Sequence, residues 1–288
     1  DRELAGQIET ADVTTVVCGA ATETRVADAA SRVAADSGDE TRDTDPGDAE
    51  SGGTGTGGGE VGGGEEGDAA CEPTAGAVSV VTVDDPRGDV ADPLSAATPE
   101  QVLAADRPLE ATQLIVFTSG TTGNPKAVRL TTENLLASAV TSVFRLGIDP
   151  SDRWLATLPL HHMGGITPIL RLPLYGTTVV LREGFEAGPA ADDIDRYGAT
   201  AVSLVPTMLR RMLNRRGTLS DSLRVVLLGG APAPAELLER CRDYSIPVYP
   251  TYGMTEAASQ ITTATPRQTR DRIGTVGKPL FGTDVTVV

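Results

Sequence analysis

The sequence predicts an α/β fold in which largely parallel sheets are flanked by helices. From residue 111 onward, short runs of β-branched residues alternate with segments of helical periodicity. Glycine, proline, serine and threonine separate these runs, as in the turns of α/β domains. With 288 residues, 40% of them apolar, the chain is long enough to bury a substantial core. Ligands of such folds bind beyond the carboxyl ends of parallel strands, so functional residues are expected in the turns that follow strands.

The expected elements fall into two parts. Residues 1–110 are predicted to form a partial N-terminal α/β subdomain, with strands at 14–18 and 78–83 and a helix at 24–35. Residues 111–288 are predicted to form the core that carries the functional motifs. Its expected strands are 113–117, 127–130, 178–181, 201–205, 224–228 and 248–250, and its expected helices are 133–146, 208–214 and 235–244.

A glycine- and glutamate-rich insert at about residues 36–76 interrupts the first part. Within it, residues 47–68 hold 11 glycines in 22 positions and only one aliphatic side chain larger than alanine. Such a segment buries too little apolar surface to offset the entropy lost on ordering. We therefore expect a disordered loop or linker, and an acidic docking segment is the alternative interpretation.

The net charge of −16 belongs to the front of the chain. Residues 1–110 hold 25 acidic against 6 basic residues, and the remainder holds 15 against 18. Nucleic-acid binding therefore has no electrostatic support. The sequence shows neither a run of about 20 apolar residues that could span a membrane nor a signal peptide, so we expect a cytoplasmic protein. Cys18, Cys71 and Cys241 have neither disulfide nor zinc-site spacing.

The expected strand at 113–117 leads into a loop rich in hydroxyl groups and glycine that ends on a lysine. Gly120 and Gly123 let backbone amides approach an anion, and Lys126 adds a positive charge. Hydroxyl donors come from Thr118, Ser119, Thr121 and Thr122. This combination favours a polyphosphate ligand, and a plain turn between two strands is the alternative. The loop is not a Walker A motif, because its glycine spacing differs and Ala127 follows the lysine.

The string Thr118-Ser-Gly-Thr-Thr-Gly-Asn-Pro-Lys126 resembles the signature loop of the adenylate-forming superfamily, which includes acyl-CoA synthetases and the adenylation domains of peptide synthetases. The resemblance implies the large N-terminal domain of that fold and a mobile loop that grips the β- and γ-phosphates of ATP. It also implies a catalytic role for Lys126. Ala127 departs from the family pattern, which usually has glycine at this position.

Further motifs follow in the family's order. Leu158-Pro-Leu-His-His-Met-Gly-Gly-Ile166 resembles a motif in which His162 borders the acyl pocket and serves catalysis. From the residues alone, capping a helix or filling a polar gap explains the pair His161 and His162 equally well. Metal binding is not expected, because adjacent side chains should point apart and no third histidine is present.

The string Leu227-Leu-Gly-Gly-Ala-Pro-Ala-Pro-Ala235 lies where a strand ends and a helix begins. Its glycines are typical of any tight turn between a strand and a helix. The resemblance implies more, namely that Gly230, Ala231 and Pro232 form one wall of the adenine site.

The string Tyr249-Pro-Thr-Tyr-Gly-Met-Thr-Glu256 contains the Y-G-x-T-E core of the same superfamily. The resemblance implies that Tyr252, next to Gly253, stacks on adenine and that Thr255 bonds the α-phosphate. Glu256 is the implied Mg²⁺ ligand and a catalytic residue. A helix cap is the plain alternative for the Thr-Glu pair.

Four segments, 203–213, 227–234, 246–261 and 277–280, resemble the o-succinylbenzoate-CoA ligase family of menaquinone biosynthesis. The resemblance extends over roughly residues 111–288. The resemblance implies an acid–thiol ligase whose substrate is a small carboxylic acid, here o-succinylbenzoate. The acid attacks the α-phosphorus of ATP to form an acyl-adenylate, and coenzyme A then displaces AMP. The implied cofactors and co-substrates are ATP, Mg²⁺ and coenzyme A.

In the family, a ribose-binding aspartate and a lysine of a small C-terminal domain lie beyond the point that corresponds to Val288. We therefore expect this chain by itself to bind nucleotide weakly and to turn over poorly. Two alternatives stay open. One is a truncated nucleotide- or acyl-binding module without full activity, and the other is a ligase for a different aryl or fatty acid.

Overall fold

A computed structural model describes residues 2–11, 15–18, 22–37, 79–82, 91–93, 108–118 and 125–286. The chain divides into two compact units, Asp1–Leu103 and Ala104–Val288, and each is described here by itself. Most of the predicted insert lies outside the described residues. Its first two positions, 36 and 37, belong to a helix that ends at Ser37.

The first unit contains a small parallel sheet. Its elements are α1 (Arg2–Thr10), β1 (Thr15–Cys18), α2 (Glu23–Ser37), β2 (Ser79–Thr82) and β3 (Ala91–Pro93), and the strands lie in the order β1-β2-β3. Val26 and Ala30 of α2 are buried together with Val80 of β2. The helix therefore covers one face of the sheet, as the alternation of strand and helix predicted.

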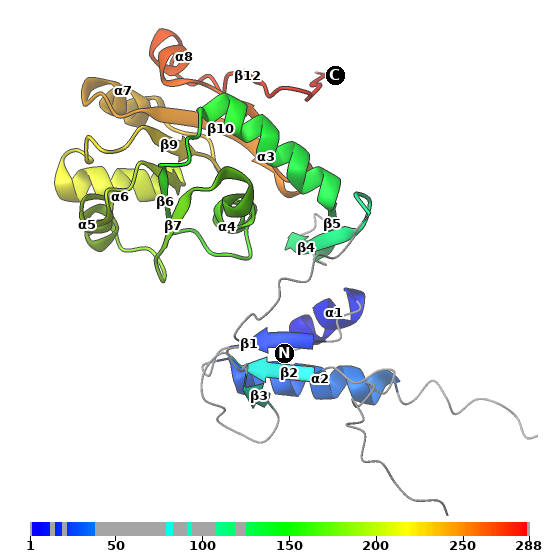
Figure 1. Ribbon diagram of the computed structural model, residues 1–288. Coiled ribbons are helices and arrows are strands. Elements are labelled where there is room, and N and C mark those ends of the chain that lie inside the picture. Colours follow the sequence, from blue (N-terminus) through cyan, green and yellow to red (C-terminus); the bar gives the residue numbers. More distant parts are fainter. Residues whose placement is uncertain are drawn as a thin grey trace, which may run out of the picture. The chain divides into compact units, whose positions relative to one another are not determined.

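The second unit begins with a hairpin and continues as an alternating α/β chain (Figure 1). The hairpin strands are β4 (Thr112–Thr118) and β5 (Lys126–Thr131), which pair antiparallel. The elements that follow are α3 (Thr132–Leu146), β6 (Arg153–Ala156), α4 (Met163–Tyr175), β7 (Thr178–Leu181), α5 (Ala187–Tyr197), β8 (Ala201–Leu204), α6 (Pro206–Arg216), β9 (Val225–Leu228), α7 (Ala235–Asp243), β10 (Val248–Met254), the 3₁₀ turn η1 (Thr255–Ala257), β11 (Ser259–Thr263), α8 (Pro266–Asp271) and β12 (Lys278–Pro279).

The main sheet of this unit has seven strands in the order β12-β11-β10-β9-β8-β6-β7. The neighbouring strands from β10 to β7 pair in parallel, and β11 and β12 add an antiparallel edge. The prediction of a largely parallel α/β fold is confirmed. The edge formed by β11 and β12 was not predicted, and β10 runs four residues beyond the predicted end at Pro250.

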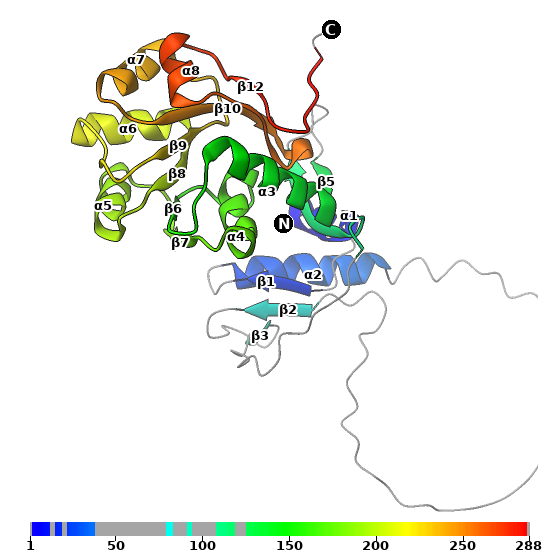
Figure 2. The same ribbon diagram turned by 45° about the horizontal axis from the view of Figure 1, so that its top comes forward.

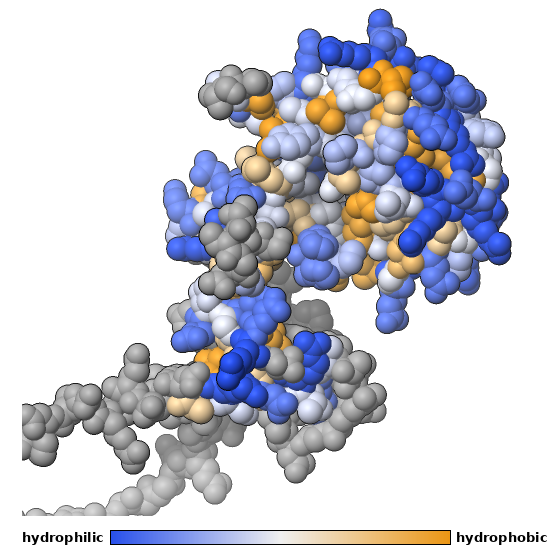
Figure 3. All heavy atoms as spheres, turned by 180° about the vertical axis from the view of Figure 1, so that it is seen from behind, coloured by the Kyte–Doolittle hydropathy of each residue, from blue (hydrophilic) through white to orange (hydrophobic). Residues whose placement is uncertain are grey.

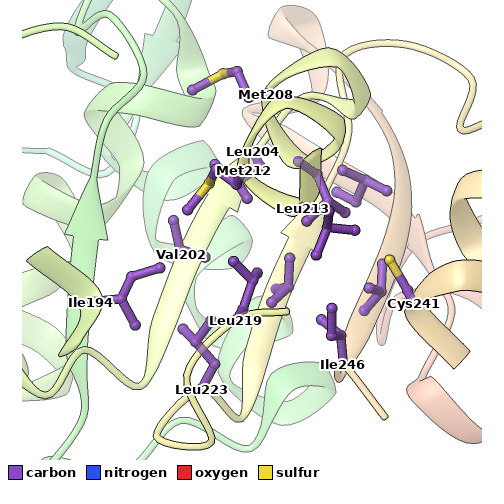
Figure 4. Packing of buried hydrophobic residues seen from close by; sticks show 14 of the residues in the cluster. Ile194, Val202, Leu204, Met208, Met212, Leu213, Leu219, Leu223, Cys241 and Ile246 are labelled. Carbon is purple, nitrogen blue, oxygen red and sulfur yellow. The ribbon is translucent and has the colours of Figure 1, made fainter. Parts of the chain in front are cut away.

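Helices cover both faces of the main sheet (Figure 1, Figure 2). On one face, Val202, Val226 and Val248 pack against α5, α6 and α7 in the largest apolar cluster. Figure 4 shows Ile194 of α5 and Met212 of α6 on this same face. On the other face, Ala201, Val225 and Leu227 lie in a separate cluster with Leu146 at the end of α3. The alternation along each strand thus sends successive side chains to opposite layers.

Local signals explain where the longest helices begin and end. Thr131 and Asn134 form a reciprocal capping box at the start of α3, and Gly147 ends that helix in the left-handed conformation. Pro206 occupies the first turn of α6, where its missing amide is not needed. These signals are local, which is why α3 and α6 were predicted within two residues at each end.

A buried aspartate ties together the amino ends of the parallel strands. Asp152, which precedes β6, accepts hydrogen bonds from Thr200 Oγ1 at 2.7 Å and from Arg224 Nε at 2.6 Å. These two residues directly precede β8 and β9. The edge of the sheet opposite the predicted functional turns is therefore stabilised by a buried charge with several partners.

The surface of the second unit is mixed. Seen from behind, the rim that carries α5, α6 and α7 is mostly hydrophilic, with apolar patches between the polar side chains (Figure 3). Among the described helices, none is long and apolar enough to cross a membrane.

Candidate functional site

The predicted motifs follow the carboxyl ends of three parallel strands. The His161–His162 segment comes after β6, the Gly229–Gly230 turn comes after β9, and Tyr252 lies near the end of β10. Because these strands are parallel, their carboxyl ends share one edge of the sheet. Functional turns were predicted to gather at such an edge, and the topology places these three there.

The β4–β5 hairpin carries the two ends of the predicted phosphate loop. Thr118 is the last residue of β4 and pairs directly with Lys126, the first residue of β5. The Lys126 side chain is exposed and Thr118 is partly exposed. Loop residues 119–124 lie outside the described residues, and among them are the predicted site residues Ser119, Gly120, Thr121, Thr122 and Gly123.

One apolar cluster joins the hairpin to two of the other motifs. Val116 of β4 and Leu130 of β5 are buried with Met163, which follows His162, and with Ala258, which follows η1. In addition, β5 packs against η1, the turn that contains Glu256. The strand that begins at Lys126 and the turn that carries the acidic residue therefore lie side by side, although they are far apart in the sequence.

The turn that presents Glu256 has an unusual backbone. A β-bulge interrupts the pairing of β10 and β11 between Tyr252 and Gly253. At Gly253, a Cβ atom would lie 1.8 Å from the carbonyl oxygen of Ser259, so no side chain fits there. Ala258 and Ser259 have φ angles of 52° and 121°. Glu256 and Tyr252 are exposed at this turn, and both side chains are accessible to a ligand.

Buried polar side chains hold the far side of the same turn. Ser138 Oγ of α3 donates to the carbonyl oxygen of Ala258 at 2.7 Å, and Ser142 Oγ donates to Gln260 Oε1 at 2.7 Å. Arg171 of α4 donates to both serine hydroxyls, at 2.8 Å and 3.0 Å. Sequence reasoning missed these residues. Their signal was a single arginine within an apolar helix and two serines one helical turn apart.

The histidine pair differs from the expectation in one respect. The rings of His161 and His162 do not point apart, because their centroids lie 4.2 Å from each other at an interplanar angle of 50°. His162 is the N-cap residue of α4 but makes no side-chain capping bond. Partial burial and the nearby His161 ring lower the pKa of His162, which favours a neutral imidazole. The ring of His162 is exposed and can contact a ligand.

The turn after β9 passes close to its neighbouring strands. A Cβ atom at Gly229 would lie 2.8 Å from Thr251 Cγ2. Gly230 has a φ of 76°, and a Cβ atom there would lie 3.1 Å from Val205. Ala231 and Pro232 follow on the surface. The glycines thus allow a tight turn whose outer residues are exposed beside the end of β10.

The side chains at this site suit a Mg²⁺ ion that is bound jointly by the protein and by a phosphate ligand. Among the described residues, no group of three or more His, Cys, Asp or Glu side chains could hold a metal by itself. Mg²⁺ commonly uses one or two carboxylates, and phosphate oxygens and water complete its coordination. A single exposed carboxylate at Glu256, next to the strand that begins at Lys126, matches this pattern.

Comparison with known proteins shows a family and individual proteins to which this chain is similar. The chain matches the AMP-binding enzyme family over residues 1–288. The 2-succinylbenzoate–CoA ligase of Bacillus subtilis is 41% identical over 199 residues, which are 69% of this chain and 41% of that protein. The ligase of the same name from Geobacillus kaustophilus is 43% identical over 182 residues, 62% of this chain and 37% of that protein. The chain therefore spans about two fifths of the length of these curated relatives.

Solved structures agree with this family. The o-succinylbenzoate coenzyme A synthetase of B. subtilis in complex with ATP and magnesium has a TM-score of 0.61 at 41% identity, over 70% of this chain and 42% of that one. A Rhodopseudomonas palustris protein described as a long-chain-fatty-acid CoA ligase has a TM-score of 0.71 over 97% of this chain and 59% of its own. Its identity of 21% shows the fold alone. The motifs, the fold and the match along residues 1–288 together show that this chain belongs to the AMP-binding enzyme family.

Proposed function

We propose that this protein activates a carboxylic acid with ATP and transfers the acyl group to coenzyme A. The observation that carries the proposal is the apolar cluster that joins the β4–β5 hairpin, the start of α4 and the turn after η1. These three parts of the structure contain or adjoin the residues Lys126, His162 and Glu256, respectively. Because the relatives above are named 2-succinylbenzoate–CoA ligases, we propose o-succinylbenzoate as the acid.

In the first half-reaction, a carboxylate oxygen of the acid attacks the α-phosphorus of ATP. The bond between the α-phosphorus and the bridging oxygen breaks, and pyrophosphate leaves with the electron pair. In this proposal Lys126 neutralises charge on the β- and γ-phosphates, and Glu256 holds Mg²⁺, which supplies further charge neutralisation when bound. The loop donors are Thr118, Ser119, Thr121 and Thr122, with backbone amides at Gly120 and Gly123.

The nucleotide is oriented by the two turns at the carboxyl ends of β9 and β10. Tyr252, 51% exposed, offers a ring on which adenine stacks, and Gly253 next to it allows the bulge in β10 at this point. Thr255 donates its hydroxyl to the α-phosphate. Gly230, Ala231 and Pro232 form the opposite wall of the adenine site.

In the second half-reaction, the thiolate of coenzyme A attacks the acyl carbon and the bond from this carbon to the AMP oxygen breaks. His162 borders the acyl group in this proposal. A charged imidazolium at His162 would form an ion pair with the acid's carboxylate and hold it in an unreactive position. The neutral imidazole forms no such ion pair. Since ATP and coenzyme A are supplied inside the cell, we also propose that the protein acts in the cytoplasm.

The test is exchange of labelled pyrophosphate into ATP, measured with a panel of acids. We expect slow exchange with o-succinylbenzoate, in keeping with the poor turnover expected of this chain by itself, and none above background with benzoate or octanoate. Exchange that depends on octanoate instead would make the protein a fatty acid ligase. Nucleotide binding is measured separately by calorimetry, since the chain spans about two fifths of its relatives' length. Binding without any exchange would favour a nucleotide-binding module.

A further inference from the structure

Arg171 is an unusual component of the α3–α4 contact. Only 6% of the residue is exposed, and its side chain pairs with no carboxylate among the described residues. Its guanidinium instead donates to Ser138 Oγ and Ser142 Oγ. A buried charge without an opposite charge is costly, and a leucine or methionine would fill the same space without that cost. Packing alone therefore does not explain why an arginine occupies this position.

The guanidinium sets the direction of two hydroxyl groups. Arginine can only donate hydrogen bonds, so both serine oxygens must accept from it. Each serine hydroxyl also has one proton of its own, which it donates to a second neighbour. For Ser138 this acceptor is the carbonyl oxygen of Ala258, and for Ser142 it is Gln260 Oε1. Arg171 thus orients two bonds that cross from α3 to the turn after Glu256.

These two bonds lie on either side of a strained backbone segment. Ala258 and Ser259 both have positive φ angles, which residues with a Cβ atom rarely adopt. The first bond holds the carbonyl of Ala258. The second holds the side chain of Gln260, whose Nε2 donates onward to Thr263 Oγ1 at 2.8 Å. A strained turn persists only when its surroundings fix it, and here the serine hydroxyls are part of those surroundings.

We propose that Arg171 is a positioning residue that fixes the turn carrying Glu256 for Mg²⁺–ATP. It acts through Ser138 on Ala258 and through Ser142 on Gln260, and it does not touch the nucleotide. This inference rests on the proposed function, in which Glu256 is the magnesium ligand. Hydrogen bonds outside the first coordination sphere orient metal ligands, and their removal commonly lowers metal affinity by about 10- to 100-fold.

The first test needs no ligand. Hydrogen exchange of the Ala258 amide, which donates to the Thr255 carbonyl at 2.9 Å, is measured in the wild type and in Arg171→Met. We expect faster exchange in the variant at this amide. Arg145→Met is the matched control. Arg145 of α3 also bonds β11, through the carbonyl of Thr263 at the far end of that strand, and it bonds the carbonyl of Pro279 in β12. It should leave the Ala258 amide unchanged.

The second test compares ATP affinity in magnesium and in excess EDTA. We expect Arg171→Met to reduce the gain in affinity from magnesium by about tenfold, with little change in EDTA. Glu256→Gln should remove the same gain, and the double variant should lose no more than Glu256→Gln alone. Arg145→Met should lower the melting temperature but keep the magnesium gain.

The outcomes separate this inference from the proposed function. If the wild type gains nothing from magnesium, or if Glu256→Gln keeps the gain, the proposed function fails. If Glu256→Gln behaves as expected but Arg171→Met weakens binding equally in magnesium and EDTA, Arg171 is a packing residue only and the inference is wrong. Should Arg171→Met not fold, Ser138→Ala removes one hydroxyl from the same path and carries the test. A magnesium gain that Ser138→Ala leaves intact overturns the proposal.

Discussion

Thr118 and Lys126 are paired at the end of the β4–β5 hairpin where the connecting loop begins and ends. The predicted phosphate loop therefore starts and ends at paired positions of a two-stranded sheet. The buried residues Val116 and Leu130 fix that sheet in the same apolar cluster as Ala258. The location of the lysine relative to the Glu256 turn is thus set by packing beneath the hairpin.

Replacing the lysine should weaken binding of ATP more than binding of AMP. In the proposed site Lys126 contacts the β- and γ-phosphates, which AMP lacks. A charge-assisted contact contributes about 1.5–3 kcal/mol, so Lys126→Ala should lower ATP affinity by about tenfold or more. Calorimetry with both nucleotides measures the difference. The matched control is Lys278→Ala, which removes an exposed lysine on β12 and should change neither affinity. An equal loss for ATP and AMP would contradict the assigned contact.

The bulge in β10 should tolerate no side chain. Gly253→Ala places a Cβ atom 1.8 Å from the Ser259 carbonyl oxygen, so the backbone must move and the Glu256 turn moves with it. We expect a lower melting temperature and loss of magnesium-dependent ATP binding. Gly274 has a φ of 84° but open space around it. Gly274→Ala should cost only about 1 kcal/mol of strain. Unchanged ATP binding in Gly253→Ala would show that the bulge does not shape the site.

Most of the parallel sheet could be predicted because its strands carry local signals. Runs such as Val225–Leu228 are continuously apolar and lie between turns. The helix α4 was missed because its sequence argues against a helix. Its first turn contains Gly164 and Gly165, and Pro168 and Pro173 lie further along it. Its stability therefore comes from packing on neighbouring elements.

The motifs of the candidate site could be predicted from the sequence. The residues that hold these motifs in place could not. The second half of β10 pairs with β11, which was not predicted, so the strand was expected to end at Pro250, before Tyr252. The Arg171 network connects α3, α4 and β11, and no sequence spacing encodes contacts among three separate elements. The ring contact of His161 and His162 depends on side-chain rotamers at the start of α4 and was likewise inaccessible.

We expect Asp152 to contribute to the free energy of unfolding and not to the affinity for ATP. Its carboxylate is buried and bonds Thr200 and Arg224 at the amino ends of the strands, away from the motif turns. Asp152→Asn should lower the free energy of unfolding by about 2 kcal/mol in urea denaturation. The exposed Arg267–Asp271 pair offers a control, since Asp271→Asn should cost about 0.5 kcal/mol or less. A large loss of ATP affinity in folded Asp152→Asn would mean that the two edges of the sheet are coupled.

The buried Cys241 should resist alkylation in the folded protein. Burial raises its pKa to about 12, so at pH 8 only about one thiol in ten thousand is ionised. The folded state holds this proton more tightly than the unfolded state, whose thiol pKa is about 8.5. The corresponding stabilisation is present below pH 8.5 and is lost as pH rises toward 12. Peptide mapping after iodoacetamide treatment at pH 8 should show labelling of Cys241 only after urea is added. Rapid labelling without urea would mean that α7 opens readily.

A crystal structure with Mg²⁺ and a non-hydrolysable ATP analogue would show whether Lys126 and Glu256 bind the same nucleotide. We expect one nucleotide with the Lys126 ammonium at the β- or γ-phosphate and the Glu256 carboxylate at the magnesium ion. A nucleotide bound elsewhere, or one that contacts only one of these two residues, would contradict it.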